Sequence, residues 1–183
     1  DSSDSGIVAY HASRRRFNRF DDGKIRNAMT AGFGHYFTQD ERLAVRFLDD
    51  HSGWLYKVRL NITDDELAYA FAELGRQPNV LRAFKSITAQ FNPRQMKRMF
   101  DGVTFVGANL DAKSITYGLE EMSYTMALSR LETVVGKDRK AANLLKVNGI
   151  NTVCFHDYRA KDGLYNFCCF DSTKIEILDR QRA

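Results

Sequence analysis

The chain has 183 residues, of which 44% are hydrophobic, which is enough for a single domain with a substantial core. Its 27 basic and 23 acidic residues leave a formal charge of only +4, so composition gives thin support to a nucleic-acid-binding module. Three cysteines cannot complete a disulfide framework and favour a reduced, cytoplasmic setting. No apolar run approaches the ~20 residues of a membrane span, and the four histidines lack the spacing of a zinc site, so we expect neither a membrane nor a metal partner.

The first predicted element is a short apolar strand with a histidine at its end. Residues 7–10 (Ile-Val-Ala-Tyr) predict this strand, and it ends at His11. A long loop is expected over residues 13–31, because this segment holds three consecutive arginines and an Asp-Asp-Gly turn. A second strand is expected at residues 32–37, within a Gly-x-Gly-x-Tyr-Phe sequence.

A helix and a third strand are predicted next. Asp40 is expected to cap a helix with Leu43 and Phe47 on its apolar face. Residues 54–60 (Trp-Leu-Tyr-Lys-Val-Arg-Leu) follow an alternating pattern that is typical of a half-buried strand.

The middle of the chain is predicted to be helical. A capping-box pattern predicts a helix over residues 63–75, and apolar residues at helical spacing predict a second helix over 81–91. An Asn-Pro pair at 92–93 is expected to start a third. Two further helices are expected at 119–135 and 141–147, each followed by a glycine.

Strands are expected again at the end of the chain. Residues 152–155 and 166–170 are apolar and are separated by a turn signal at 161–163. A short last strand is expected at 174–178. Strands, then helices, then strands again indicate an α+β fold rather than a parallel sheet of βαβ units.

Three segments, taken in order, resemble an ADP-ribosyltransferase domain of the histidine-tyrosine branch, which includes diphtheria toxin and the poly(ADP-ribose) polymerases. The segments are His11-Ala12-Ser13, the Gly-x-Gly-x-Tyr-Phe sequence ending at Phe37, and the late strand that runs from Asn166 to Asp171. The pattern is most similar to the transferase domains of phage polyvalent proteins. Those domains share with this chain a Phe-x-x-Phe loop, here at residues 17–20, and a Gly-Ile pair, here at 149–150.

The resemblance implies a single domain over residues 1–183 with a split antiparallel β-sheet core, into which residues 64–116 form a helical insertion. It also implies a mono-ADP-ribosyltransferase that cleaves NAD, its co-substrate, at the nicotinamide bond. The ADP-ribose would pass to a macromolecular acceptor, either a protein or a nucleic acid, as in a toxin, an effector or a phage-encoded protein. Such a cleavage develops an oxocarbenium-like cation, so the pocket must hold a flat cationic ring and exclude water.

The resemblance assigns a role to each motif residue. His11 would bind the adenosine ribose, and the backbone of Ala12 would pair with the nicotinamide amide. Tyr36 would stack on nicotinamide, where a cation–π contact contributes about 0.5–2 kcal/mol. Phe47 is expected to be either a second stacking aromatic or a core residue beside Leu43.

Asn166 departs from the family pattern, because the polymerases and toxins have a glutamate at this position. Asparagine can still bind the ribose hydroxyl, but it carries no negative charge. The loss of one preorganised stabiliser typically costs on the order of 10²–10³ in rate. The substitution favours mono-transfer over polymer growth, since elongation in the polymerases depends on the glutamate.

Further residues are candidates with open alternatives. Ser13 and Arg14 are expected in the cofactor site, where Arg14 and the two arginines after it would meet the pyrophosphate or form an ordinary solvated loop. Asp157 and Asp162 are candidates for a base on the predicted hairpin loop. Two other functions remain open: a catalytically weak domain that binds NAD or a partner, suggested by Asn166, and a basic nucleic-acid-binding module, suggested by the charge.

Overall fold

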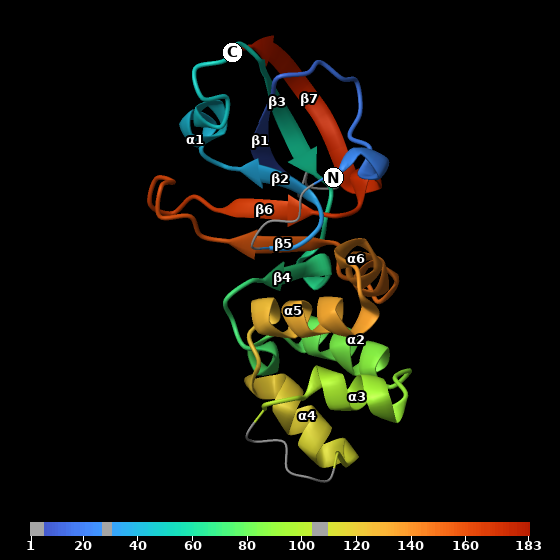
Figure 1. Cartoon of the computed structure of the whole chain (residues 1–183). Coiled ribbons are helices and arrows are strands. Elements are labelled where there is room, and N and C mark those ends of the chain that lie inside the picture. The colour runs from blue at the N-terminus through green and yellow to red at the C-terminus, as the bar shows by residue number, and fades with distance from the viewer. Residues whose placement is uncertain (1–5, 27–30, 104–109) are drawn as a thin grey trace, which may run out of the picture.

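The computed structural model describes residues 6–26, 31–103 and 110–183. The α+β prediction is confirmed: a seven-stranded sheet has the order β4-β5-β6-β2-β1-β3-β7, helices α2–α6 gather beyond its β4 edge, and α1 lies beside β1 and β2 (Figure 1). Neighbouring strands are antiparallel except β4 and β5, which are parallel. The strands are β1 (Ile7–Ser13), β2 (His35–Thr38), β3 (Trp54–Leu60), β4 (Leu67–Tyr69), β5 (Thr152–Phe155), β6 (Asn166–Cys169) and β7 (Ile175–Arg182). The helices are α1 (Glu41–Arg46), α2 (Pro78–Thr88), α3 (Pro93–Met99), α4 (Ala112–Glu121), α5 (Tyr124–Val135) and α6 (Asp138–Val147).

The sheet is weakly joined between β1 and β2. These strands share a single register pair, Tyr10 opposite Thr38, whereas β1 pairs with β3 from Ile7 to Ser13. On its other side, β2 pairs with β6 along its full length. The two halves of the sheet therefore separate beyond Tyr10, and the β2 half turns away from the β1–β3–β7 half (Figure 1).

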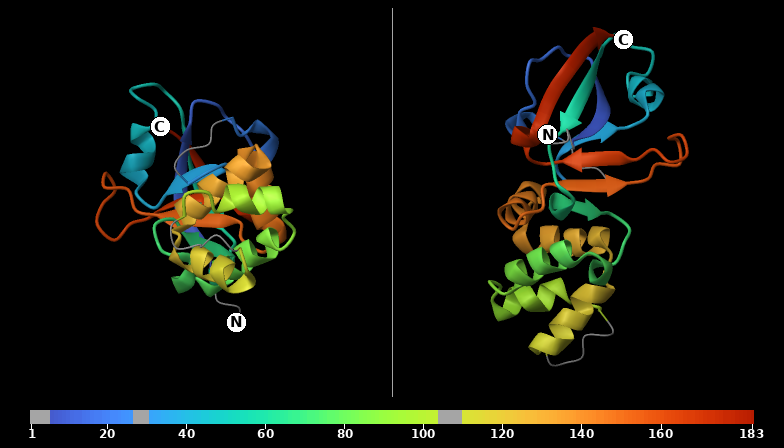
Figure 2. Two further views of the ribbon diagram at one scale, coloured as in Figure 1. Left: turned by 60° about the horizontal axis from the view of Figure 1, so that its bottom comes forward. Right: turned by 180° about the vertical axis from the view of Figure 1, so that it is seen from behind.

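Two apolar cores lie on opposite faces of the central strands. Val153 and Cys168 belong to the core shared with helices α2–α6, whereas Cys154 and Phe167 belong to the core shared with β1 and β3. Strands that are buried on both faces need apolar residues at successive positions, and this explains the continuous apolar sequences of β5 and β6. Figure 2 shows that helices α2–α6 lie at one end of the sheet, whereas α1 lies at the other.

The predicted helix over residues 63–75 is wrong. Thr63 and Glu66 form the expected capping box, but only one 3₁₀ turn follows it, and the chain continues as strand β4. Leu67 and Ala68 are buried and pair with β5. Sheet pairing and burial therefore outweigh the local helix signal. The segment 64–116 thus contains a strand as well as helices, and its residues 104–109 lie outside the described part of the chain.

Other boundaries also differ from the predictions. The single helix expected at 119–135 is two helices, α4 and α5, because Ser123 breaks the run and its hydroxyl caps α5 by accepting from the Met126 N–H at 3.2 Å. Strand β1 extends to Ser13, and β7 extends to Arg182. Within the long loop expected over 13–31, a 3₁₀ turn forms at Asp22–Lys24, while residues 27–30 lie outside the described residues.

Candidate active site

A cavity of about 280 Å³ opens where β1 and β2 separate. Its floor is a row of four residues in register across four strands: Tyr10 faces Thr38, Thr38 faces Asn166, and Asn166 faces Phe155. Paired residues in a sheet project from the same face, so these four side chains line one surface. Helix α1 and the loop between β5 and β6 lie at the same end of the central strands (Figures 1 and 2), and the helix with its C-cap and the loop each contribute two residues to the cavity lining.

Beyond the Tyr10–Thr38 pair, a side-chain contact of His11 replaces backbone pairing between β1 and β2. Its Nδ1 lies 2.8 Å from the backbone oxygen of Tyr36. A carbonyl can only accept, so Nδ1 carries the hydrogen and Nε2 is left as an acceptor. Burial lowers the pKa of His11, while the bond to Tyr36 opposes this shift and the charge of His35 adds a smaller decrease. The imidazole is therefore neutral at neutral pH, between Phe20 and Phe37.

The hydroxyl of Tyr36 is hydrogen-bonded to the backbone, which leaves the ring to line the cavity. Tyr36 Oη donates to the oxygen of Gly32 at 2.6 Å. Gly32 has φ +91°, a left-handed conformation that favours glycine. A Cβ on Gly34 would lie 2.5 Å from Cys168 Sγ, so only glycine permits the close approach of β2 to β6. The two motif glycines thus hold Tyr36 in place.

Phe47 lies at the mouth of the cavity. It follows helix α1 and lines the cavity with 49% of its surface exposed, whereas Leu43 is buried. The interpretation of Phe47 as a core residue beside Leu43 is therefore wrong. The guanidinium carbon of Arg159 lies 5.5 Å from the centroid of the Phe47 ring, so one cation already occupies a cation–π position on it.

Asn166 is buried but incompletely bonded. Its Nδ2 lies 3.4 Å from Asp157 Oδ2, and a carboxylate can only accept, so the amide nitrogen must face Asp157. The other amide atom, Oδ1, has no hydrogen-bond partner, and among the described residues it is the one buried side-chain nitrogen or oxygen of this kind. Unpaired buried acceptors are rare, and this one borders a cavity where a water molecule or a donor on a ligand can satisfy it.

Asp157 and Arg159 form an ion pair at the edge of the cavity. Arg159 Nη2 lies 2.6 Å from Asp157 Oδ2, and Arg159 Nε lies 3.0 Å from Oδ1. These hydrogen bonds, together with the charge of Arg159, hold the pKa of Asp157 below its ordinary value despite partial burial. Of the two hairpin-loop carboxylates expected from the sequence, Asp157 lines the cavity and Asp162 is exposed outside it. The sequence offered only a weak signal for Arg159, an opposite charge two residues from Asp157.

A second hollow of about 430 Å³ shares His11 with the first and is lined by five arginine and lysine side chains and by the carboxylate of Asp21. Tyr56 orders the loop that forms it, since Tyr56 Oη accepts the Phe17 N–H at 2.8 Å and lies 3.2 Å from the Arg15 oxygen. Ser13 lines this second hollow, whereas Arg14 is exposed and lines neither hollow. Its basic residues are Arg15, Arg16, Arg19, Lys24 and Arg26, with His11 and His35 beside them.

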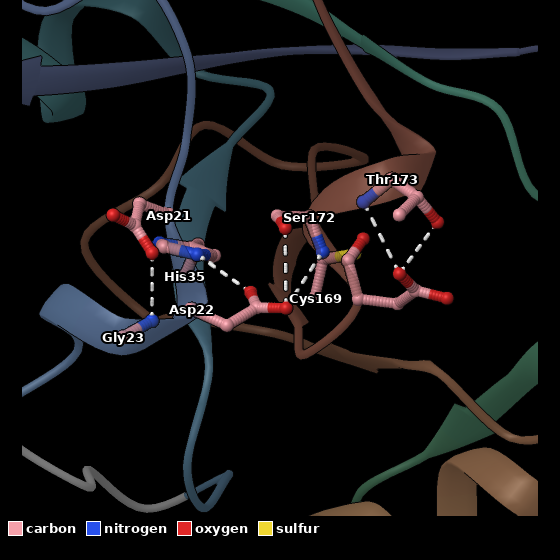
Figure 3. A network of polar contacts seen from close by, with 8 residues as sticks. Asp21, Asp22, Gly23, His35, Cys169, Ser172 and Thr173 are labelled. Carbon is pink, nitrogen blue, oxygen red and sulfur yellow. Dashed lines mark hydrogen bonds and ion pairs between the residues drawn. The ribbon is translucent and has the colours of Figure 1, made fainter.

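A polar network fixes His35 at the edge of the basic hollow (Figure 3). Asp22 Oδ1 lies 3.0 Å from His35 Nε2, and Asp22 Oδ2 accepts from the Ser172 hydroxyl at 3.1 Å. Burial lowers the pKa of His35, and the contact with Asp22 opposes this shift. The carboxylate stands between histidine and serine, so the histidine does not contact the hydroxyl as a nucleophile's base must. The network ties the loop after β1 to the segment after β6.

The described residues give little support to thiolate chemistry, to a metal site or to a membrane-spanning helix. Cys154, Cys168 and Cys169 are unpaired and buried, and burial raises the pKa of Cys154 to about 12 and that of Cys169 to about 11, so neither thiol is a thiolate at neutral pH. Across residues 6–26, 31–103 and 110–183, no group of three His, Cys, Asp or Glu side chains could hold a metal ion. No helix in these ranges is both long and apolar enough to cross a membrane.

No protein-family model, curated protein or solved structure matches this chain. The site residues and their geometry are therefore the basis for a functional proposal.

Proposed function

We propose that this chain is a mono-ADP-ribosyltransferase with the split-sheet fold of that family. It would cleave NAD at the nicotinamide bond and transfer ADP-ribose to a protein or nucleic acid. The observation that carries the proposal is the pair of hollows on either side of His11, one aromatic and one basic. NAD has matching halves, a flat cationic ring at one end and two phosphates further along.

The aromatic cavity suits the nicotinamide end of NAD. Tyr36 and Phe47 both line it, and a pyridinium over an aromatic face gains about 0.5–2 kcal/mol; on Phe47 the nicotinamide would take the place of the Arg159 guanidinium or the opposite face of the ring. Its volume of about 280 Å³ is just below the range of about 300–1,000 Å³ that ligand pockets commonly span. The cavity therefore suits one ring and its sugar, and the rest of a dinucleotide must extend past His11.

Two acceptors on the protein suit the sugar hydroxyls. The unpaired Asn166 Oδ1 can accept from the ribose next to nicotinamide, which would satisfy a buried atom that otherwise lacks a partner. His11 Nε2 can accept from a hydroxyl further along the ligand, since Nδ1 is already committed to Tyr36. The neutral imidazole does not repel the cationic ring.

The basic hollow suits the phosphates. Arg15 and Arg16 line it; they are two of the three arginines that were expected either to meet the pyrophosphate or to form an ordinary solvated loop. Arginine binds phosphate oxygens through its planar fork of donors. Arg16 also lies 5.0 Å from the Trp54 ring centroid, a contact that orients its guanidinium.

The proposal is tested by NAD turnover. Purified protein with NAD should release nicotinamide, and labelled NAD with cell lysate should give labelled macromolecules. His11→Ala and Tyr36→Ala should abolish both signals. His51→Ala and Tyr117→Ala alter exposed residues outside the two hollows and serve as matched controls. Full labelling by the His11 and Tyr36 variants would contradict the site assignment.

Asn166 favours one alternative, a domain that binds NAD without turning it over, because its amide carries no charge to stabilise the ribosyl cation. Calorimetry that detects NAD binding, with no release of nicotinamide over hours, would support this alternative.

If the protein is an active transferase, mass spectrometry of labelled lysate with and without nuclease would separate protein from nucleic-acid acceptors.

A further inference from the structure

We propose that Asp157 supplies the negative charge that Asn166 lacks. The catalytic carboxylate of this chain then comes from the loop between β5 and β6, and not from strand β6. This inference rests on the proposed transferase function and identifies the residue that would make the chemical step feasible.

The position of Asp157 is the first argument. Among the described residues, it is the one carboxylate that lines the aromatic cavity. Its side chain is 10% exposed, and its Oδ2 lies 3.4 Å from Asn166 Nδ2. A ribose hydroxyl bound by the unpaired Asn166 Oδ1 would therefore lie one amide group away from a fixed negative charge.

The rigidity of the loop is the second argument, because a charge stabilises a transition state best when it needs no rearrangement. The backbone of Gln39 donates to the Tyr165 oxygen at 2.9 Å, and Gln39 Oε1 accepts the Tyr165 N–H at 3.0 Å. Asp40 Oδ2 accepts the Lys161 N–H at 2.9 Å. These contacts attach the turn of the loop and its second arm to the start of helix α1, and within the loop the Ala160 N–H donates to the Asp157 backbone oxygen at 2.9 Å.

The carboxylate itself is also fixed in orientation. Asp157 Oδ1 accepts from the backbone N–H of Arg159 at 2.9 Å and from its Nε at 3.0 Å. The ion pair keeps the carboxylate charged, since it lowers the pKa of Asp157. For the same reason Asp157 is a poor base, so its role is to stabilise charge and not to take a proton.

The step balances without any other reactant. The bond between the ribose C1′ and the nicotinamide nitrogen breaks, and its electron pair goes to the ring nitrogen, which gives neutral nicotinamide. The positive charge then lies on the ribosyl group near Asp157. A nucleophile of the acceptor forms the new bond to C1′ and releases its proton to water. Asp157 and Asn166 end the step unchanged.

The test is the isosteric change Asp157→Asn, followed by nicotinamide release and by calorimetry with NAD. We expect release to fall on the order of 10²–10³-fold, the usual effect of losing one preorganised stabiliser, while NAD binding persists. Asp162→Asn is the matched control, because Asp162 is a carboxylate of the same loop outside the cavity. Release by Asp157→Asn at the wild-type rate would overturn the inference.

A second variant moves the charge to the family position. In Asp157→Asn/Asn166→Glu the carboxylate returns to β6, and we expect nicotinamide release to rise above that of Asp157→Asn alone. Because Asp157→Asn leaves the Arg159 charge uncompensated at the cavity, Asp157→Asn/Arg159→Gln is measured beside it; this variant replaces the ion pair with two amides and should show the same loss, and it also serves if Asp157→Asn does not fold, as judged by thermal unfolding. A rate equal to wild type in that folded variant would also overturn the inference.

The two proposals fail in different ways. If wild-type protein neither binds NAD nor releases nicotinamide, the transferase function fails and the role of Asp157 fails with it. If wild type is active and Asp157→Asn is equally active, only the role of Asp157 fails.

Discussion

The two hollows beside His11 differ in almost every chemical respect. The first is lined mainly by aromatic rings and by the Asp157–Arg159 ion pair, and the second mainly by arginines and a lysine, together with Asp21 and two phenylalanines. A single neutral imidazole separates them, bonded to the backbone of Tyr36. A site for a cationic ring and a site for anionic phosphates can therefore lie next to each other. The histidine that they share carries no charge, so it weakens the binding of neither group.

The largest predicted effect on stability concerns strand β2, which borders both hollows. We expect Gly34→Ala to lower the free energy of unfolding by about 1–3 kcal/mol, as overpacking usually does. The added Cβ would lie 2.5 Å from Cys168 Sγ and 3.0 Å from the Cys169 oxygen, so β2 would be pushed away from β6. Chemical denaturation measures the change.

A double-mutant cycle sharpens this prediction. Cys168→Ala removes the sulfur that the new methyl group meets but leaves the backbone oxygen of Cys169. We therefore expect Gly34→Ala/Cys168→Ala to lose less stability than the sum of the two single changes. Strict additivity would show that the two positions are not in conflict.

The second prediction separates the two hollows by ligand. Phe47→Ala should weaken binding of NAD about 2- to 30-fold, the range of a cation–π contact of about 0.5–2 kcal/mol. Binding of ADP-ribose, which has no nicotinamide, should not change. Val45→Ala is the matched control, since Val45 is exposed on the same helix and lies outside the aromatic cavity. An equal loss for both ligands would contradict the assignment of Phe47 to the cationic ring.

The third prediction concerns the basic hollow. Arg15→Ala should weaken NAD and ADP-ribose alike, because both carry the pyrophosphate. The loss should shrink as salt is added, since exposed charges are screened over about 10 Å at 0.1 M. Arg14→Ala should have a smaller effect, because Arg14 lines neither hollow. Titration calorimetry at low and high salt compares the two variants. A loss confined to NAD would contradict this assignment.

The sequence predicted which strands carry the candidate site but not how the strands meet. His11, Tyr36 and Asn166 lie on β1, β2 and β6, and all three line the same cavity. Periodicity identifies a strand and its apolar residues, but it contains no information on how many residue pairs join two neighbouring strands. Strands β1 and β2 share a single pair, Tyr10 and Thr38, and the cavity opens where the pairing ends. This arrangement therefore became evident only in the structure.

Loops and local signals account for the rest of the difference. The partnership of Asp157 and Arg159 depends on the turn after β5, and loop residues follow no period that would bring them together in advance. The capping box at Thr63 was predicted correctly, but the helix expected after it was wrong. Pairing with β5 and burial stabilise Leu67 in a strand more than a helix would. Phe47 shares helical spacing with Leu43, but the helix ends before it and the ring turns to the cavity.

The last prediction tests the neutrality of the shared histidine. Burial lowers the pKa of His11 in the folded state, whereas the unfolded chain should keep the ordinary value near about 6.5. Between these two values the unfolded chain binds more protons, so acid favours unfolding there. Stability from this source is present above about pH 6.5 and is lost as the pH falls below it, by at most about 1.4 kcal/mol for each pH unit. The loss ends once the pH is below the folded pKa.

Denaturation between about pH 5 and 8, the range of histidine titration, measures the slope. His35 contributes in the same direction, because burial lowers its pKa as well. We therefore expect His11→Gln, which cannot titrate, to flatten the curve only in part, and His11→Gln/His35→Gln to flatten it further. NMR titration of the ring protons assigns each histidine. A folded His11 that titrates at the ordinary value would mean that the boundary between the two hollows carries a positive charge in mild acid, and nicotinamide binding would then weaken there.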